Sequence, residues 1–146
     1  MSYSLGKRSK ERLRGVKPSL VKVVQRAIEI TEQDFTVIEG LRTQTRQREL
    51  VRQGKSQTMN SRHLTGDAVD LGAWENGHIS WKVGGKKQRY QKIAKAMFQA
   101  AEELGVNIRW GGNWDGDDTQ RDERFRDLVH FELPRNTSIN YQQGKL

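Results

Sequence analysis

The sequence of 146 residues contains no cysteine, two prolines, three histidines and no long apolar run. The lack of cysteine excludes disulfides, thiolate nucleophiles and cysteine-ligated zinc, and it is compatible with folding in a reducing cytoplasm. The first 20 residues are charged throughout and lack the apolar segment of a secretory signal. No apolar stretch is long enough to cross a bilayer. We therefore expect neither a signal peptide nor a transmembrane segment.

The length and charge of the chain indicate one basic domain over residues 1–146. Its formal net charge is +8 and its pI is about 10.0, which favours polyanionic partners such as nucleic acid, acidic cell-wall polymers or anionic membrane surfaces. Basic residues are concentrated at 7–17 and 82–95, but no aromatic residues are interleaved with them in a nucleic-acid-binding motif. We therefore expect a monomer that does not bind nucleic acid.

Hydrophobic periodicity predicts an α+β fold with a small, mostly antiparallel sheet and flanking helices. Apolar residues recur at helical spacing after Pro18 and again before Gly105. The predicted helices cover residues 18–30, 44–53 and 86–104, and the predicted strands cover residues 35–39, 68–71, 107–110 and 128–133. The dipeptide Asn76-Gly77 is typical of a tight turn.

Two short segments contain residues that suit a metal site. His63 and Asp70 are seven residues apart, and Asp127 precedes His130 by three residues. Two imidazoles and one carboxylate can bind a catalytic zinc that keeps a fourth position for water, whose pKa falls to roughly 7. His63, Asp70 and His130 are thus candidate ligands. From spacing alone, Asp70 can equally be an ordinary strand-end carboxylate and the histidines core or surface residues, and the His-Glu-x-x-His signature is absent.

Asp127 is the candidate for moving protons at such a site, because it lies close in sequence to a ligand. On a regular strand, however, Asp127 and His130 would face opposite sides of the sheet. The two can act together only if Asp127 lies in the loop before the strand or at a bulge. His78 lies in the predicted turn, and we expect it to be exposed rather than a ligand.

Several motifs follow one another in a specific order along nearly the whole chain. They are Arg14-Gly15-Val16-Lys17-Pro18, Glu39-Gly40-Leu41-Arg42-Thr43, Ser61-x-His63-x-x-Gly66-x-Ala68-x-Asp70, Trp110-Gly111-Gly112-Asn113-Trp114, Asp127-x-x-His130 and His130-Phe131-Glu132-Leu133. In this order the chain resembles the zinc D-Ala-D-Ala carboxypeptidase family, and most closely its phage endolysin branch, the L-alanyl-D-glutamate endopeptidases. The resemblance implies a zinc D-Ala-D-Ala carboxypeptidase/hedgehog-like fold.

The resemblance also implies roles for single residues. His63, Asp70 and His130 are implied to bind one Zn²⁺, with Asp127 as the catalytic base. Aspartate at this position agrees with the endolysin branch, whereas the carboxypeptidases usually have glutamate there. Arg42 is implied to contact the substrate and to stabilise the developing oxyanion, and its alternative role is a surface salt bridge.

Three further residues are weaker candidates for substrate contacts. Ser61 and Gln47 are implied by the resemblance, since Gln47 follows Arg42 by five residues as in the family. Trp114 can line a groove for a sugar or peptide, or else fill the core; for Trp110 we favour the core.

Between these tryptophans and His130 lies an acidic loop that contains Asp115, Asp117, Asp118 and Asp122. It lacks the glycine position and closing glutamate of an EF-hand. We expect a solvated loop there, with a second cation such as Ca²⁺ as the alternative.

The resemblance implies a zinc endopeptidase that hydrolyses the L-Ala–D-Glu bond of bacterial peptidoglycan as a phage lysis enzyme. It would remain in the host cytoplasm until a holin-type protein releases it to the cell wall, and it would have no separate cell-wall-binding domain. The alternatives are a D-Ala-D-Ala carboxypeptidase on the same scaffold and a non-catalytic module that binds zinc or nucleic acid.

Overall fold

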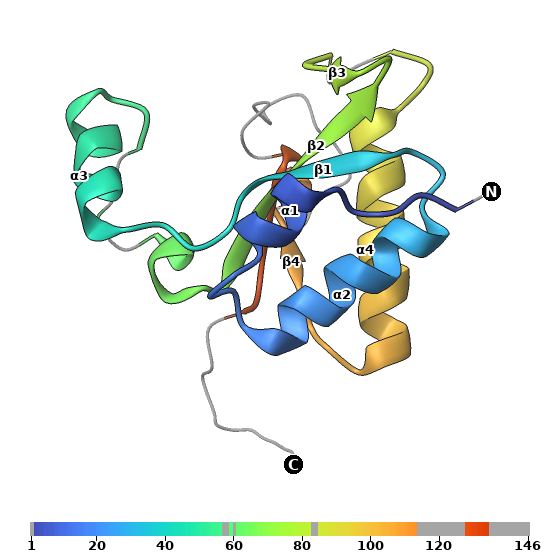
Figure 1. Cartoon of the computed structure of the whole chain (residues 1–146), viewed down its shortest axis with the longest axis horizontal. Helices are drawn as coiled ribbons and strands as arrows, with labels where there is room; N and C mark the ends of the chain where they lie inside the picture. Colours follow the sequence, from blue (N-terminus) through green and yellow to red (C-terminus); the bar gives the residue numbers. More distant parts are fainter. Residues whose placement is uncertain (1, 57–58, 60, 83–84, 114–127, 135–146) are drawn as a thin grey trace.

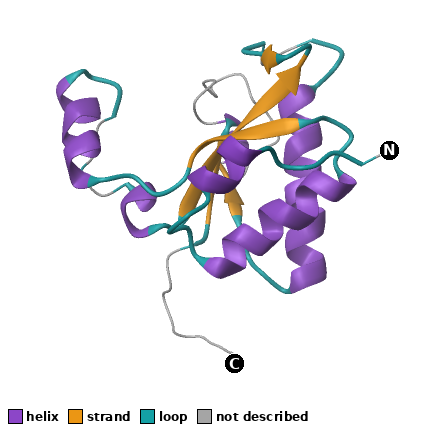
Figure 2. Cartoon of the chain, in the orientation of Figure 1, coloured by secondary structure: helices purple, strands orange, loops and turns teal. Residues whose placement is uncertain are grey.

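The computed structural model describes residues 2–56, 59, 61–82, 85–113 and 128–134, and its centre is an antiparallel β-sheet (Figures 1 and 2). The strands are β1 (Phe35–Glu39), β2 (Ala68–Glu75), β4 (Arg109–Trp110) and β5 (His130–Glu132), in the order β1-β2-β5-β4. The short β3 (His78–Ile79) pairs with the end of β2 and forms a hairpin. The α+β prediction is confirmed.

One face of the sheet contains the core because apolar residues alternate along the two longest strands. Phe35 and Val37 of β1, and Val69, Leu71 and Ala73 of β2, are buried together. The helices α2 (Pro18–Ile30) and α4 (Arg89–Leu104) complete this core with their apolar faces, and they lie next to each other in Figure 1. Asp70 has the opposite parity on β2, so its side chain points to the other face of the sheet.

The helix α1 (Lys7–Arg12) lies along β1, the edge strand of the sheet. The hydroxyl of Ser9 accepts a hydrogen bond from the backbone N–H of Val37 (3.0 Å), and Arg12 Nη1 donates to the carbonyl of the same residue (2.9 Å). The helix thereby satisfies backbone groups that an edge strand would otherwise leave open. This helix was not predicted, since its sequence has no apolar stripe.

The other elements largely agree with the predicted ranges. α3 (Gln44–Arg52) begins after Thr43, whose side chain accepts from the backbone N–H of Arg46, and it extends away from the sheet in Figure 1. α4 begins at Arg89, three residues later than predicted, and β2 continues four residues further, to Glu75. The last strand is shorter than predicted: Leu128 and Val129 precede it, and Leu133 follows it.

None of the helices in the described ranges combines the length and the apolar composition needed to cross a membrane.

Candidate metal centre

A single 3₁₀ turn and the glycine after it position His63. The turn η1 (Arg62–Thr65) begins at Ser61, whose hydroxyl accepts from the backbone N–H of His63 (3.2 Å). Gly66 ends it with a left-handed backbone (φ +77°), and a Cβ there would lie 2.4 Å from the carbonyl oxygen of Gly15. Glycine is therefore required on both conformational and steric grounds. The change of chain direction at Gly66 leads directly into β2, which contains Asp70.

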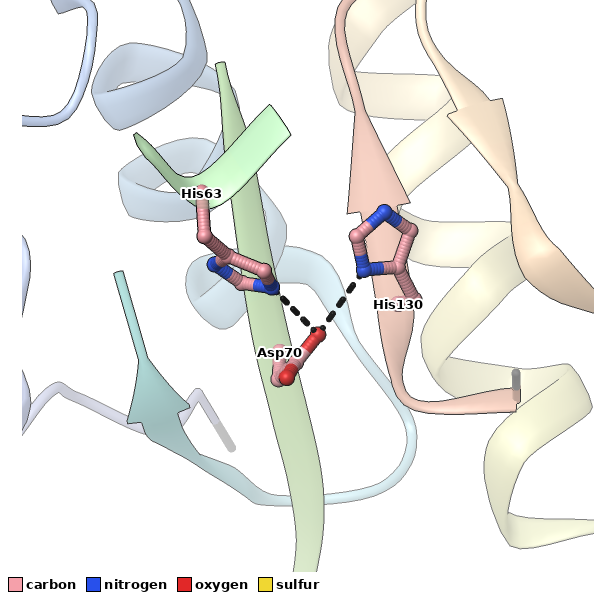
Figure 3. Close-up of side chains that lie close together, drawn as sticks. All are labelled: His63, Asp70 and His130. Carbon is pink, nitrogen blue, oxygen red and sulfur yellow. Dashed lines mark hydrogen bonds and ion pairs between the residues drawn. The ribbon is translucent and has the colours of Figure 1, made fainter. Parts of the chain in front are cut away.

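Antiparallel pairing of β2 with β5 brings His130, which is distant in sequence, next to Asp70. Asp70 of β2 lies directly opposite His130 of β5, so their side chains are neighbours on one face of the sheet. Asp70 Oδ1 lies 3.1 Å from His63 Nε2 and 3.0 Å from His130 Nδ1. In Figure 3 the two imidazole rings lie on either side of this carboxylate. Three residues from η1, β2 and β5 thus converge on one point.

The outer nitrogen of each imidazole has its own acceptor. His63 Nδ1 donates to the carbonyl oxygen of Gly40 at 2.7 Å, and His130 Nε2 donates to Glu132 Oε1 at 2.9 Å. These two contacts leave His63 Nε2 and His130 Nδ1 facing Asp70, where each nitrogen can offer a lone pair to a metal ion once it has lost its proton. Such second contacts are the usual way in which proteins orient histidine ligands of metals.

This arrangement of donors fits a metal ion. One ligand atom from each of His63, Asp70 and His130 lies within 4.8 Å of the other two. Two nitrogen lone pairs and a carboxylate oxygen at these distances repel one another, so a proton or a metal ion must lie between them. Tetrahedral zinc with ligands at about 2.0–2.1 Å would separate two ligand atoms by about 3.3 Å, close to the observed distances.

The charge distribution in the metal-free centre supports the same conclusion. Burial disfavours charge on His130, but hydrogen bonds to Asp70 and Glu132 outweigh burial and raise the pKa of the imidazole to about 9. Burial likewise opposes ionisation of Asp70, yet hydrogen bonds from the two histidines hold the pKa of its carboxyl well below the usual range. The pocket therefore favours a positive charge beside Asp70, and a proton takes that place when no metal is bound.

The centre is accessible from one side. The His63 side chain is 2% exposed, whereas those of Asp70 and His130 are 16% and 17% exposed. The buried His63 is hydrogen-bonded to the carbonyl oxygen of Gly40, whereas Asp70 and His130 are partly exposed to solvent. A small molecule or peptide can therefore approach Asp70 and His130.

A second group of polar side chains surrounds Arg42. Arg42 Nε and Nη2 donate to the two carboxylate oxygens of Glu39 at 2.9 and 2.5 Å. Nη1 donates to Gln47 Oε1 at 2.6 Å and lies 3.4 Å from Ser61 Oγ. The backbone N–H of Arg42 also donates to the carbonyl oxygen of His63 at 2.9 Å. Arg42 is therefore connected to the metal-centre turn through Ser61 and through its own backbone.

A cavity of about 520 Å³ lies beside this group. Arg42 and Ser61 contribute polar groups to its wall, and Leu41, Met59 and Leu64 contribute apolar surface. Leu41 and Met59 are 48% and 40% exposed. A mixed wall of this kind suits a ligand with both polar and apolar parts.

The structure places the remaining predicted residues differently. Gln47 is fully buried, and its amide donates to Ser56 Oγ at 2.9 Å, so its burial favours support of Arg42 over direct contact with a substrate. Asp127, Trp114 and the acidic loop lie outside the described residues. Leu128 and Val129 do not belong to β5, so the last strand begins only at His130.

Two of the minor expectations are confirmed. His78 is exposed, and Trp110 is a core residue whose Nε1 donates to the carbonyl oxygen of Leu128 at 2.8 Å.

Sequence reasoning missed the functions of two glutamates. Glu132 belongs to one of the sequence motifs, and the structure makes its carboxylate the acceptor for His130 Nε2. The signal was its position two residues after a ligand on a strand, which places both side chains on one face. Glu39 had no assigned role at all, although its spacing of three residues from Arg42 would permit an ion pair.

Comparisons with known proteins agree with this geometry. A family model described as phage L-alanyl-D-glutamate peptidase matches residues 1–134. The chain is 37% identical over 139 residues to the L-alanyl-D-glutamate peptidase of Escherichia phage T5, which covers 91% of this chain and 99% of that protein. It is 34% identical over 83 residues to the enzyme of the same name from Listeria phage A118, covering 57% of this chain and 27% of that protein.

A solved structure is similar over most of its length. The crystal structure of the Serratia marcescens L-Ala D-Glu endopeptidase ChiX matches with a TM-score of 0.75 and 44% sequence identity, covering 88% of this chain and 87% of that one.

Proposed function

Because the chain belongs to the phage L-alanyl-D-glutamate peptidase family, we propose that it is a zinc-dependent endopeptidase that hydrolyses the L-Ala–D-Glu bond of peptidoglycan stem peptides. The observation that carries the zinc assignment is the convergence of one nitrogen from each imidazole, His63 Nε2 and His130 Nδ1, on Asp70 Oδ1. The family supports the assignment of peptide-bond hydrolysis, and the convergence of the three side chains supports the use of zinc in that reaction.

The ligand set consists of His63 Nε2, Asp70 Oδ1 and His130 Nδ1. Zinc in a site with three protein ligands polarises a carbonyl oxygen and lowers the pKa of a bound water to about 7. Gly40 and Glu132 keep the two rings in the tautomers that such binding requires.

Asp127 is the proposed proton carrier. Its carboxylate would accept a proton from the attacking water and return it to the amine of D-Glu as the peptide bond breaks, which is general base and then general acid catalysis. The residue precedes His130 by three positions, as in the family motif.

Arg42 is the proposed partner of the substrate oxygen that becomes negative during hydrolysis. A fixed guanidinium stabilises an oxyanion most effectively when it is in position before the reaction. Arg42 lies in the cavity wall next to Ser61, and this position supports the role. Ser61 directly precedes η1, the turn that contains His63. Ser61 would contribute a hydroxyl to the same wall.

The proposed substrate explains the strong positive charge. Bacterial envelopes are polyanionic, so a net charge of +8 would concentrate the enzyme at the cell wall. We propose that the protein acts there as a lysis enzyme, made in the host cytoplasm and released by a holin-type protein.

Incubation of the purified protein with peptidoglycan, followed by mass spectrometry of the products, tests this function. We expect new amino-terminal D-Glu, loss of cleavage with a chelator, and recovery with zinc. His130→Ala should be inactive, whereas the matched His78→Ala, which changes an exposed histidine, should be fully active. Release of D-Ala instead would identify a carboxypeptidase, and no cleavage at any zinc concentration would exclude both activities.

A further inference from the structure

We propose that Glu39 is a positioning residue that holds the Arg42 guanidinium in the orientation needed for hydrolysis; this inference rests on the proposed function. Glu39 lies at the end of β1, outside the set of metal ligands. It would act only through Arg42.

The contact between the two side chains is a two-point contact. Both carboxylate oxygens of Glu39 accept from different nitrogens of Arg42, Nε at 2.9 Å and Nη2 at 2.5 Å. Paired parallel hydrogen bonds of this kind fix the plane of the guanidinium as well as its position. With Gln47 on Nη1, every nitrogen of the side chain has a protein acceptor. A long, flexible side chain is thereby held in one conformation.

The pairing of the strands places Glu39, and with it the contact to Arg42, next to the metal centre. The pairing of β1 with β2 is irregular between Val37 and Glu39, and beyond the irregularity Glu39 lies opposite Asp70, a proposed metal ligand. Three residues later, the backbone of Arg42 bonds to His63. The segment from Glu39 to Arg42 is therefore fixed at both ends next to proposed metal ligands, Asp70 at one end and His63 at the other.

The Arg42 side chain is only 9% exposed, and that of Glu39 is 28% exposed. Arg42 is bonded to the turn that contains His63 through its backbone N–H and through Nη1, so a shift of the guanidinium plane changes the position of its charge relative to the metal centre. A displacement of about 1 Å of a catalytic contact can cost about 100-fold in rate.

The simpler alternative is an ion pair that only stabilises the fold, and the chain contains a matched control for it. Glu75 and Arg89 form the same two-point contact at 3.2 and 2.8 Å, with side chains 25% and 9% exposed. Glu75 lies five residues beyond Asp70 on β2, roughly 17 Å along an extended strand. Loss of either pair should have a similar effect on stability.

The experiment compares Glu39→Gln and Glu75→Gln in zinc content, thermal unfolding, and kcat and KM for a soluble stem peptide. Both variants should fold and keep zinc. We expect Glu39→Gln to lose about 10- to 100-fold in kcat/KM, mainly through kcat, while Glu75→Gln keeps wild-type activity. Glu39→Asp, which retains the charge, should recover part of the loss.

A double-mutant cycle with Arg42→Ala completes the test. If Glu39 acts through Arg42, adding Glu39→Gln to Arg42→Ala should cause no further loss of activity. Equal activity of the two glutamine variants, or an undiminished effect of Glu39→Gln without Arg42, would overturn the proposal while wild-type cleavage upholds the proposed function. A wild-type protein that does not cleave stem peptides would defeat the proposed function, and the role of Glu39 with it.

Discussion

At the scale of single residues, the chemistry of the centre depends on which nitrogen of each histidine faces Asp70. Gly40 and Glu132 occupy the outer nitrogens, and the inner ones meet at Asp70. The three candidate ligands were named from the sequence because imidazole and carboxylate are residue types that bind zinc, although their spacing alone left other roles open. The groups that accept hydrogen bonds from the outer nitrogens could not be predicted, since one of them is the backbone carbonyl of Gly40, 23 residues away from His63 in sequence.

The proposed roles of Asp127 and Glu132 can be separated by two neutral substitutions. Asp127→Asn should bind zinc normally but lose at least about 100-fold in kcat, because an amide cannot accept the proton. Glu132→Gln should instead weaken zinc binding by about 10- to 100-fold, because it loosens the orientation of His130. Zinc titration and peptidoglycan hydrolysis measure the two effects. If Asp127→Asn remains active, the base is another residue.

At the scale of elements, the centre depends on how η1 joins β2. Gly66 ends the turn, and its carbonyl oxygen accepts from the backbone N–H of Lys17 at 2.8 Å. The segment therefore packs against the residues before α2 as well as leading to Asp70. The glycine of the sequence motif thus has a physical reason, the close approach of the Gly15 backbone.

Substitution of Gly66 by alanine should be much more harmful than the same change at Gly54. Both glycines have a left-handed backbone, with φ of +77° and +76°, but a Cβ at Gly54 would meet nothing within 4 Å. Gly54→Ala should cost about 1 kcal/mol for the conformation alone. Gly66→Ala should cost about 1–3 kcal/mol more for the steric overlap, and it should weaken zinc binding. Urea unfolding measures the difference, and equal losses would show that the contact with Gly15 is unimportant.

The elements also differ in how far they could be predicted. α2 and α4 have apolar faces, and β1 alternates, so local periodicity was sufficient for each. α1 buries only Ser9 among its residues, and its contacts with Val37 are long-range hydrogen bonds. A helix stabilised in this way has no hydrophobic pattern to reveal it.

At the scale of the whole molecule, we expect metal binding and folding to be coupled through His130. In the metal-free protein the pKa of its imidazole is raised from 6.5 to about 9. The native state therefore binds this proton more tightly than the unfolded chain does. The resulting stability is complete below about pH 6.5 and is lost as the pH rises through about 9.

We therefore expect the chelator-treated protein to lose about 1–3 kcal/mol of unfolding free energy between pH 6.5 and 9. Urea titrations across this range measure the loss, and His130→Gln should remove most of the pH dependence. With zinc bound, the ion replaces the proton, so the loss should be absent. A metal-free protein whose stability does not fall over this range would contradict the raised pKa.

Local sequence was enough to predict the class of fold and most of its helices and strands, and it singled out the residue types that can hold a metal ion. These properties follow from periodicity, turn chemistry and ligand preference, which act over a few residues. Folding added what depends on distant contacts: the orientation of the imidazoles by Gly40 and Glu132, the fixation of Arg42 by Glu39 and Gln47, and the protection of the β1 edge by α1. Each of these is a hydrogen bond whose geometry exists only after the strands have paired, so no pattern along the chain reveals it.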